Sequence, residues 1–328
     1  MEDRVSPEKI REYAKDFESV RKELEKIIVG QKDVINNLLV GLVSNGHILV
    51  EAVPGLAKTL IIRALATVTG CQFKRIQFTV DLLPTDITGV TSYHKAKGFY
   101  IIKGPIFANF VLADEINRAP PKTQSALLEA MGERQVTIGR TTFKVPNPFF
   151  VMATQNPIES AGTYALPEAQ LDRFLFKVFI NYPNNEEENL ILDRNINTKT
   201  FDSFGLKAVI KPERILEMQA DAKRMYLDDK IKNYIVELTN ATRHPEKYGI
   251  ELGKYIEYGS SPRNSINMYI AAKAKALIEG KPYVTPQHVK KVAEDVMRHR
   301  IILNYEGVAE AISTSSIVKE ILSKVPVP

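Results

Sequence analysis

The sequence predicts an α/β protein whose N-terminal half holds a mainly parallel sheet and whose C-terminal half is all-helical. Short, mostly continuous apolar runs alternate with helical stretches as far as Ile180, and no such runs follow Asn185. A strand that helices cover on both faces is apolar at nearly every position, as these runs are. The length of 328 residues suits about two domains.

Two helices are predicted before the first strand. Ser6 can cap the first helix and Pro7 suits its first position, so this helix runs to about Glu25. The second helix covers Gln31–Ser44, where apolar residues recur on one face.

Four apolar runs are predicted as core strands: His47–Val53, Phe110–Ala113, Pro148–Ala153 and Arg173–Ile180. Two passages interrupt the alternation of strands and helices. Residues 81–104 are polar and contain several glycines, whereas Gln135–Val145 has two β-prone segments around a central glycine. The second passage therefore predicts a hairpin inserted before the next core strand.

Helical patterns replace strands after a linker at Tyr182–Asn185. Ser261–Pro262 and Thr285–Pro286 each open a helix, because a capping hydroxyl precedes a proline in both. We predict a first domain over residues 1–182 and an all-helical second domain over residues 183–328.

Composition excludes several classes of protein without naming a function. Subtracting 39 acidic from 44 basic residues leaves +5, which permits contact with nucleic acid but does not indicate it. A single cysteine, Cys71, excludes an intrachain disulfide and a thiolate metal cluster. No run reaches the roughly 18 apolar residues of a membrane span. We expect a soluble cytoplasmic protein with no membrane insertion.

A phosphate-binding loop is predicted where the first strand runs into Pro54–Thr59 and then a helix. Lys58 would reach the β- and γ-phosphates, and Thr59 would place its hydroxyl on Mg²⁺. The expected nucleotide-binding residues are Pro54, Gly55, Leu56, Ala57, Lys58, Thr59 and Leu60. A generic strand-turn-helix also fits this stretch, so the loop alone does not decide.

The loop departs from the pattern G-x-x-x-x-G-K-[ST] at two positions, which Ala52 and Ala57 occupy in place of glycine. We expect Ala57 to take the helical conformation that alanine favours and Gly55 to supply the positive φ. Ala52 lies at the strand exit, where its methyl group can crowd the returning loop.

Polar residues end two further strands. Asp114 and Glu115 follow an apolar run, and parallel strands bring such residues to the carboxyl edge of a sheet, where ligands bind. Asp114 would hold Mg²⁺ and Glu115 would polarise the attacking water. After the third strand we favour Asn156 over Gln155 for orienting that water, although Asn-Pro can also be a simple turn.

Seven blocks together carry a family resemblance: Gly30–Gln31, Pro54–Thr59, Leu82–Gly89, Gly104–Asn109, Leu112–Pro120, Ala153–Pro157 and Leu166–Phe174. They resemble the MoxR group of AAA+ ATPases over nearly the whole chain. The resemblance implies a P-loop NTPase core with a parallel sheet between helices, a C-terminal helical lid, ATP and Mg²⁺ as ligands, and a homo-oligomeric ring, expected to be a hexamer. Ala57 matches this family's loop, whereas Ala52 departs from it.

The resemblance also assigns roles to arginines and inserts. Arg173 would be an arginine finger in the neighbouring subunit's site, and Arg263 a second sensor that touches the γ-phosphate of its own subunit. Arg118 is a further candidate for intersubunit contact. Residues 81–104 and 135–145 resemble the helix-2 insert and pre-sensor hairpin, which face the ring's channel. Ordinary ion pairs and ring-stabilising loops are the alternatives.

The predicted function is ATP hydrolysis by a ring motor that remodels client protein complexes, with a von Willebrand A domain protein as partner. One alternative is a nucleic-acid or metal-chelatase motor, but the sequence lacks a Lys/Arg stripe interleaved with aromatics. Another is a nucleotide-gated scaffold that barely hydrolyses ATP, which Ala52 would favour.

Overall fold

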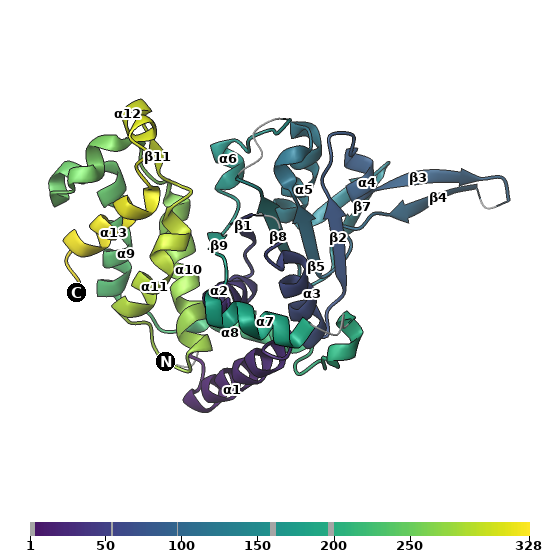
Figure 1. Ribbon diagram of the computed structural model, residues 1–328, viewed down its shortest axis with the longest axis horizontal. Helices are drawn as coiled ribbons and strands as arrows, with labels where there is room; N and C mark the ends of the chain where they lie inside the picture. Colours follow the sequence, from purple (N-terminus) through teal and green to yellow (C-terminus); the bar gives the residue numbers. More distant parts are fainter. Residues whose placement is uncertain (1–3, 54, 97, 158–161, 196–199) are drawn as a thin grey trace.

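The computed structural model describes residues 4–53, 55–96, 98–157, 162–195 and 200–328, so Pro54 lies outside the described residues. In the described part of the chain, five parallel strands form the central sheet in the order β2-β5-β8-β1-β9 (Figure 1). These strands are β1 (Ile48–Ala52), β2 (Phe73–Gln77), β5 (Phe110–Asp114), β8 (Phe150–Gln155) and β9 (Phe176–Ile180).

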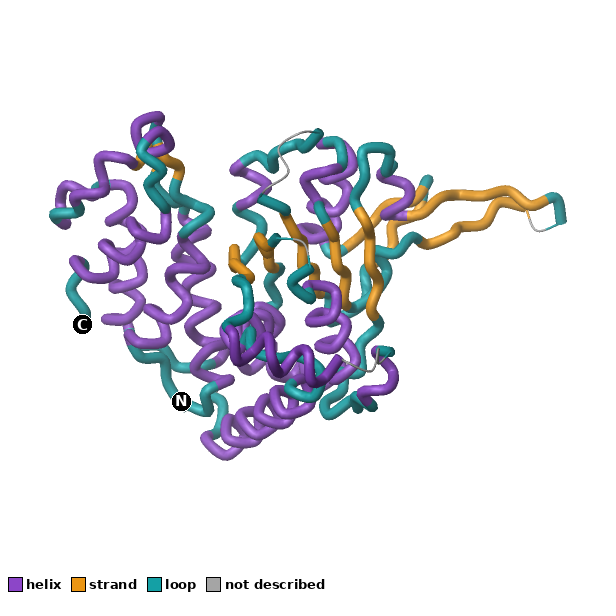
Figure 2. The backbone as a smooth tube through the Cα atoms, viewed as in Figure 1, coloured by secondary structure: helices purple, strands orange, loops and turns teal. Residues whose placement is uncertain are grey.

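Helices cover both faces of the sheet, as the apolar runs predict (Figure 2). Alternate residues of β1 enter different cores, since Ile48 and Val50 pack with one cluster and Leu49 with the other. The first cluster includes α1 (Pro7–Leu24), α2 (Lys32–Val43) and α3 (Lys58–Val68), and the second includes α5 (Pro121–Glu133). The α/β prediction for this half is confirmed.

The edge strand β2 was not among the predicted strands. Its residues Lys74 and Arg75 are exposed and only Ile76 is buried, so the segment lacks a continuous apolar run. An edge strand pairs on one side only, here with β5, and tolerates polar side chains for that reason.

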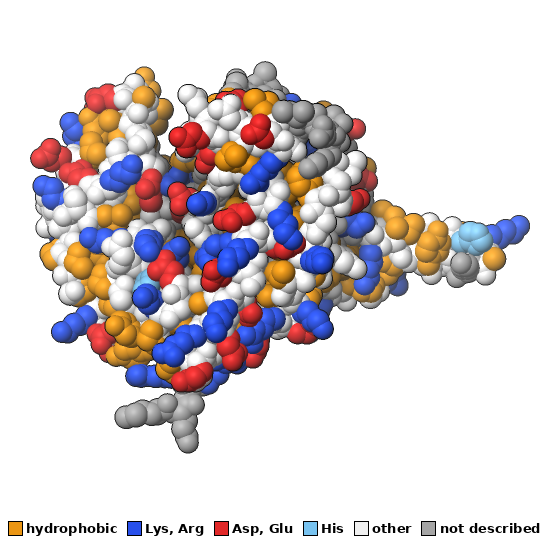
Figure 3. All heavy atoms as spheres, turned by 60° about the horizontal axis from the view of Figure 1, so that its bottom comes forward, with side chains coloured by type: hydrophobic (Ala, Val, Ile, Leu, Met, Phe, Trp, Pro, Cys, Tyr) orange, Lys and Arg blue, Asp and Glu red, His pale blue; other side chains and the backbone are white. Residues whose placement is uncertain are grey.

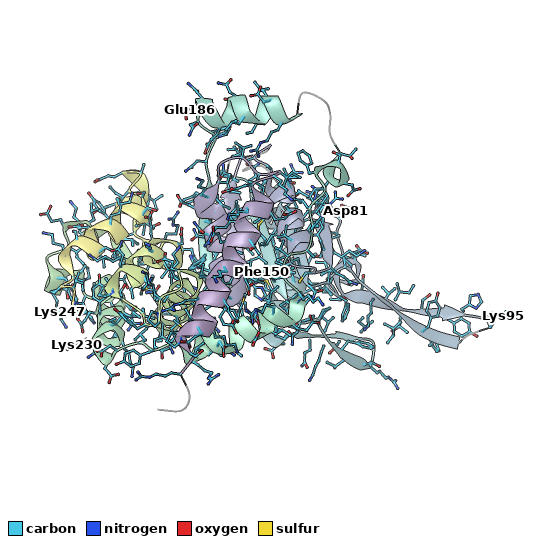
Figure 4. The ribbon with its side chains drawn as sticks, turned by 90° about the horizontal axis from the view of Figure 1, so that it is seen from below. Asp81, Lys95, Phe150, Glu186, Lys230 and Lys247 are labelled. Carbon is cyan, nitrogen blue, oxygen red and sulfur yellow. The ribbon has the colours of Figure 1, made fainter. Side chains whose placement is uncertain are left out.

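The passage predicted as polar, residues 81–104, contains α4 (Pro84–Thr88) and the hairpin of β3 (Gly89–His94) and β4 (Gly98–Lys103). This hairpin projects far from the body, with Lys95 near its tip (Figure 4). Its base needs glycine at position 89, where φ is 107° and a Cβ atom would lie 2.2 Å from the Ile102 carbonyl oxygen.

The second predicted insert is confirmed as a hairpin, formed by β6 (Gln135–Ile138) and β7 (Thr141–Lys144). Its turn includes Gly139, whose φ of 63° is left-handed.

The second half is mainly helical, but the prediction that it is all-helical is wrong, because it also contains a short pair of strands. Helix α6 (Glu168–Leu171) still belongs to the first half, since it precedes β9. The helices of the second half are α7 (Asn185–Asn195), α8 (Pro212–Arg224), α9 (Asp229–Arg243), α10 (Pro262–Ile278), α11 (Pro286–Met297), α12 (Tyr305–Ala309) and α13 (Thr314–Lys324). Short 3₁₀ segments cover Ile116–Arg118, Phe201–Phe204, Pro245–Tyr248 and Glu251–Tyr255. A small antiparallel pair, β10 (Ile256–Tyr258) and β11 (Ile302–Leu303), joins this half as well. Ser261 caps α10 by accepting a hydrogen bond from the Arg263 amide, as its Ser-Pro start predicts.

Helix α8 joins the two halves. The Tyr13 hydroxyl on α1 donates to Asp221 at 2.7 Å, and the Gln219 side chain donates to the Leu42 carbonyl at 2.8 Å. Helices α9 to α13 form the bundle at the left of Figure 1, in which α11 packs against β9, the edge strand of the sheet. The domain boundary after residue 182 stays a prediction. Among the described residues, none of the helices combines the length and apolar character needed to cross a bilayer.

Candidate active site

The loop between β1 and α3 has a strained backbone at two positions. Gly55 has a φ of 87°, which confirms the positive φ expected there. The expectation for Ala57 is wrong, because this residue caps α3 in the left-handed conformation with φ 52° and ψ 20°. That conformation costs an alanine about 1 kcal/mol. Ala57 therefore adopts the left-handed conformation that glycine would take at this position.

Ala52 does not crowd the loop. It is 3% exposed, ends β1 opposite Ile180 and packs in the core on that face of the sheet. The buried ammonium of Lys58 donates a hydrogen bond to the Ala52 carbonyl at 3.4 Å. The Lys58 side chain therefore lies against the C-terminal end of β1, at the carboxyl edge of the sheet.

Asp114 is the last residue of β5 and is 6% exposed. Its Oδ1 accepts a hydrogen bond from the Thr154 hydroxyl at 2.7 Å. Its Oδ2 accepts two from Arg75, at 2.6 Å from Nη2 and 3.1 Å from Nε. These bonds offset the cost of removing the carboxylate from water.

Glu115 follows with a left-handed backbone, at φ 57°. Its amide donates to the Thr154 hydroxyl at 2.9 Å, so one threonine orients both acids. The Glu115 Oε2 accepts a hydrogen bond from Gln77 at 2.9 Å and lies 3.3 Å from the Arg118 guanidinium. The carboxylate is thereby aimed along the carboxyl edge of the sheet.

Asn156 comes directly after β8 and is 4% exposed. Side chains alternate along a strand, so Asn156 shares its side with Thr154. Strand β8 lies between β1 and β5, with Val50 opposite Thr154 and Ala113 opposite Ala153. The ends of the three strands meet at one edge, and the structure brings Lys58, Asp114 and Asn156 together there.

A cavity of about 170 Å³ adjoins the loop. Its walls are mainly apolar and include Ile28, Val29, Leu56, Leu60, Pro183 and Ile191. Segments from before β1 and after β9 thus close a pocket beside Gly55 and Ala57. Such a pocket suits the flat, apolar face of a nucleotide base.

Sequence reasoning missed three residues of this edge, namely Arg75, Gln77 and Thr154. Thr154 directly follows the apolar run Phe150–Ala153, so its hydroxyl is expected to be buried. Buried polar groups need a hydrogen-bond partner, and this need is the signal that could have identified Thr154. The spacing of Arg75 and Gln77 places both on one face of β2, but the strand itself was not predicted.

The two predicted arginines lie elsewhere. Arg173 precedes β9, so it is at the amino edge of the sheet, and its Nη1 donates to the Leu128 carbonyl on α5 at 2.6 Å. The Arg263 Nη1 lies 3.6 Å from the Asp172 carboxylate. A strand of this length separates the two edges by roughly 17 Å.

This placement corrects one expectation. Arg263 was expected to touch the γ-phosphate of its own subunit, but its partner Asp172 is at the edge opposite to the Lys58 loop. The structure instead places Arg263 beside the segment that carries Arg173. Arg118 lies at the carboxyl edge, next to Glu115.

Comparison with known proteins agrees with this geometry. Residues 47–176 match the ATPase family associated with various cellular activities (AAA), and residues 253–321 match the AAA lid domain. The chain is 46% identical to chaperone MoxR1 of Mycobacterium tuberculosis over 93% of its length and 81% of the relative's. It is also 46% identical to the uncharacterized protein YeaC of Bacillus subtilis, over 93% and 92% of the two chains.

A solved structure shares the whole arrangement. The crystal structure of a candidate ATPase from Cytophaga hutchinsonii superposes with a TM-score of 0.92 at 47% identity. The match covers 98% of this chain and 97% of that one.

Proposed function

Since this chain belongs to the MoxR family of AAA+ ATPases, we propose that it is a Mg²⁺-dependent ring motor that remodels client protein complexes together with a von Willebrand A domain protein. The chain is an ATPase, which converts ATP and water to ADP and phosphate. One observation carries the ring: the loop and acids lie at one edge of the sheet, whereas Arg173 lies at the other. A cytoplasmic location stays a prediction.

The loop fits the phosphates of a nucleotide. The left-handed residues Gly55 and Ala57 lead directly into α3, whose first-turn amides have no acceptor within the helix. Such a helix start binds anions, and Lys58 adds a positive charge. We propose that Leu56 and Leu60, which line the adjoining cavity, contact the base.

The carboxyl edge also fits Mg²⁺. Among the residues that the structure describes, no three His, Cys, Asp or Glu side chains gather in a way that could hold a metal ion. We propose that the Asp114 carboxylate and the Thr59 hydroxyl hold Mg²⁺ only when phosphate oxygens complete its shell. When bound, Mg²⁺ would neutralise charge on the phosphates.

Glu115 and Asn156 have the chemistry to handle the attacking water. The Glu115 carboxylate accepts hydrogen bonds, so it can take a proton from water once Gln77 or Arg118 yields its place. The Asn156 amide can orient the same water and contact the γ-phosphate. We therefore assign base and positioning roles to these two residues.

We propose that Arg173 and Arg263 both serve the neighbouring subunit. Both lie at the amino edge, and a head-to-tail contact would bring this edge to the next subunit's carboxyl edge. Repeating that contact closes a ring, which we propose is a hexamer on the strength of family resemblance. Arg118, at the carboxyl edge, would then face the same interface.

Replacing Arg75 with methionine is expected to destabilise the protein slightly when no nucleotide is bound. The same change is expected to raise the affinity of the site for a divalent metal ion. Arg75 is the cation beside Asp114, and its side chain is 48% exposed, so its loss lowers the free energy of unfolding without nucleotide by only about 1 kcal/mol. With no cation to displace, affinity for Mn²⁺ in the presence of ADP rises about fivefold. Chemical denaturation and a Mn²⁺ titration by electron paramagnetic resonance measure the two effects.

The matched control for this variant is Lys74→Met, on the same strand but exposed and on the opposite face. It should change neither quantity. Weaker Mn²⁺ binding by Arg75→Met would contradict the prediction. It would mean that Arg75 promotes metal binding and does not compete with the metal ion for Asp114.

The hairpin of β3 and β4 is the surface that we propose contacts the client. Tyr93 and Phe99 face each other across it, 63% and 79% exposed, with ring centroids 5.1 Å apart. On its other face, Val90 and Ile102 are 39% and 47% exposed. Figure 3 shows hydrophobic side chains along the projecting hairpin. Apolar side chains on both faces of an isolated ribbon indicate a binding surface.

A trapped complex tests the proposed function. Glu115→Gln chains with bound ATP, incubated in lysate from the source organism, should retain a von Willebrand A domain protein and a client complex. Chains that also carry Tyr93→Ser and Phe99→Ser should lose the client while binding ATP equally well. Mass spectrometry of the retained proteins, with ADP in place of ATP as control, gives the result.

Two outcomes would contradict this proposal. Retention of the same proteins with ADP would show that capture does not depend on the motor state. A steep salt dependence of oligonucleotide binding, with stimulated turnover, would favour the nucleic-acid motor instead.

A further inference from the structure

Arg300 ties the helical half to the segment that carries Arg173. Its side chain follows α11, is 6% exposed and donates to three carbonyls of that segment. Nη2 donates to Phe174 at 2.6 Å and to the Asp172 carbonyl at 3.2 Å, and Nη1 donates to Leu175 at 3.3 Å. The same guanidinium also bonds the Val296 carbonyl of its own helix. These hydrogen bonds therefore fix the backbone on both sides of Arg173 relative to the C-terminal end of α11.

Asp172 completes this connection. Its Oδ1 accepts a hydrogen bond from Arg300 Nε at 2.7 Å. Its Oδ2 accepts one from the Ser261 hydroxyl at 3.1 Å and lies 3.6 Å from Arg263. One carboxylate thus joins the end of α11, the N-terminus of α10 and the residue next to the arginine finger.

The Arg300 guanidinium keeps its charge in this buried position. Burial lowers the pKa of Arg300 to about 10, with Asp172 opposing the shift, so the guanidinium stays charged at neutral pH. Beside it, His299 is half-buried, and the loss of solvent around its ring lowers its pKa well below the ordinary value. Its Nε2 lies 3.2 Å from the Phe174 carbonyl. A charged fork with fixed donors holds a backbone turn more rigidly than a flexible ammonium does.

We propose that Arg300 and Asp172 are positioning residues that transmit the position of the helical half to Arg173, and so set the hydrolysis rate in the neighbouring subunit. The proposal rests on the role of Arg173 in the neighbouring site that is proposed above. Movement of α10 and α11 relative to the sheet must displace residues 172–175 or break these bonds. Either result changes where the finger lies.

Mixed rings test this proposal, because each chain can be restricted to one role. An Arg173→Ala chain keeps its own site but has no finger, whereas a Glu115→Gln chain has a finger but no base. Mixing these two chains should recover phosphate release at interfaces where the second chain faces the site of the first. Adding Arg300→Lys to the Glu115→Gln chain should lower that recovery at least tenfold.

The same substitution on the Arg173→Ala chain should leave recovery unchanged, since that chain has no finger to position. The matched control is Arg298→Lys on the Glu115→Gln chain, which should also leave recovery unchanged. Arg298 is 9% exposed and pairs with Glu294 and Asp295 on its own helix, with no hydrogen bond to residues 172–175 in the described structure.

Each outcome is decisive. Equal loss with Arg300→Lys on either chain would overturn the proposal, because a merely structural defect does not depend on the chain's role. Should Arg300→Lys chains fail to assemble, Asp172→Asn takes its place with the same expectation. If the first mixture recovers no activity, the role of Arg173 in the neighbouring site is wrong and the coupling falls with it.

Discussion

Glu115→Gln chains are expected to bind ATP as tightly as the unmodified chain and to hydrolyse it about a thousandfold more slowly. Glutamine keeps the shape of the side chain and its bond to Gln77, but its amide cannot take a proton from water. Because the loop and Lys58 follow β1, whereas Glu115 follows β5, we expect nucleotide affinity to be unaffected. Phosphate release measures turnover, and a fluorescent ATP analogue measures binding.

Glu129→Gln is the control, since Glu129 is exposed on α5. It should hydrolyse ATP at the unmodified rate. Unchanged hydrolysis by Glu115→Gln would mean that another group is the base. Turnover of the unmodified chain as slow as that of Glu115→Gln would instead favour the nucleotide-gated scaffold, although the ordinary strand position of Ala52 gives that alternative no support.

Arg173→Ala is expected to lower turnover about a thousandfold, the effect of losing an arginine that stabilises charge on the transferred phosphate. Its guanidinium lies on α5, where Gly132 leaves it room, and it is a strand's length from its own Lys58. ATP binding by the same chain should therefore persist. Steady-state phosphate release and nucleotide titration separate these two quantities.

Mixing distinguishes a role in the neighbouring site from a defect within the chain. In an equal mixture with Glu115→Gln, about one ordered pair of neighbours in four joins an intact site to an intact finger, so about a quarter of the turnover should return. Arg11→Ala, at an exposed arginine of α1, is the control and should keep full turnover. An inactive mixture would contradict the placement of Arg173 at an interface.

The parts of the site that could be predicted are those whose strand and polar residues lie within one short stretch of the sequence. The strand before Lys58, the strand before Asp114 and the strand before Asn156 are each continuous apolar runs, and their polar ends follow directly in the chain. Parallel pairing then brings such ends to one edge whatever the details of packing. Both inserts could be located in the same way, from glycines that interrupt the apolar pattern.

The backbone of the loop shows where local reasoning reaches its limit. Alanine favours the helical region, and the sequence around Ala57 predicts that conformation. Packing of β1 and α3 into the core instead determines the angle at which the loop must enter the helix, and Ala57 takes a left-handed conformation to meet it. A preference of about 1 kcal/mol is small beside the burial of two elements.

The sequence by itself determined the alternation of buried strands and helices, the phosphate-binding loop and the paired acids. Only the tertiary structure decided that Arg75 forms an ion pair with Asp114 and that Arg263 lies at the edge opposite to Lys58. The hydrogen bonds from Arg300 to the backbone around Arg173 also depend on the tertiary structure. The physical reason is the range of the contacts. Apolar periodicity reports whether a residue is buried, whereas Arg300 and Asp172 are 128 positions apart and meet only because α11 packs against the start of β9.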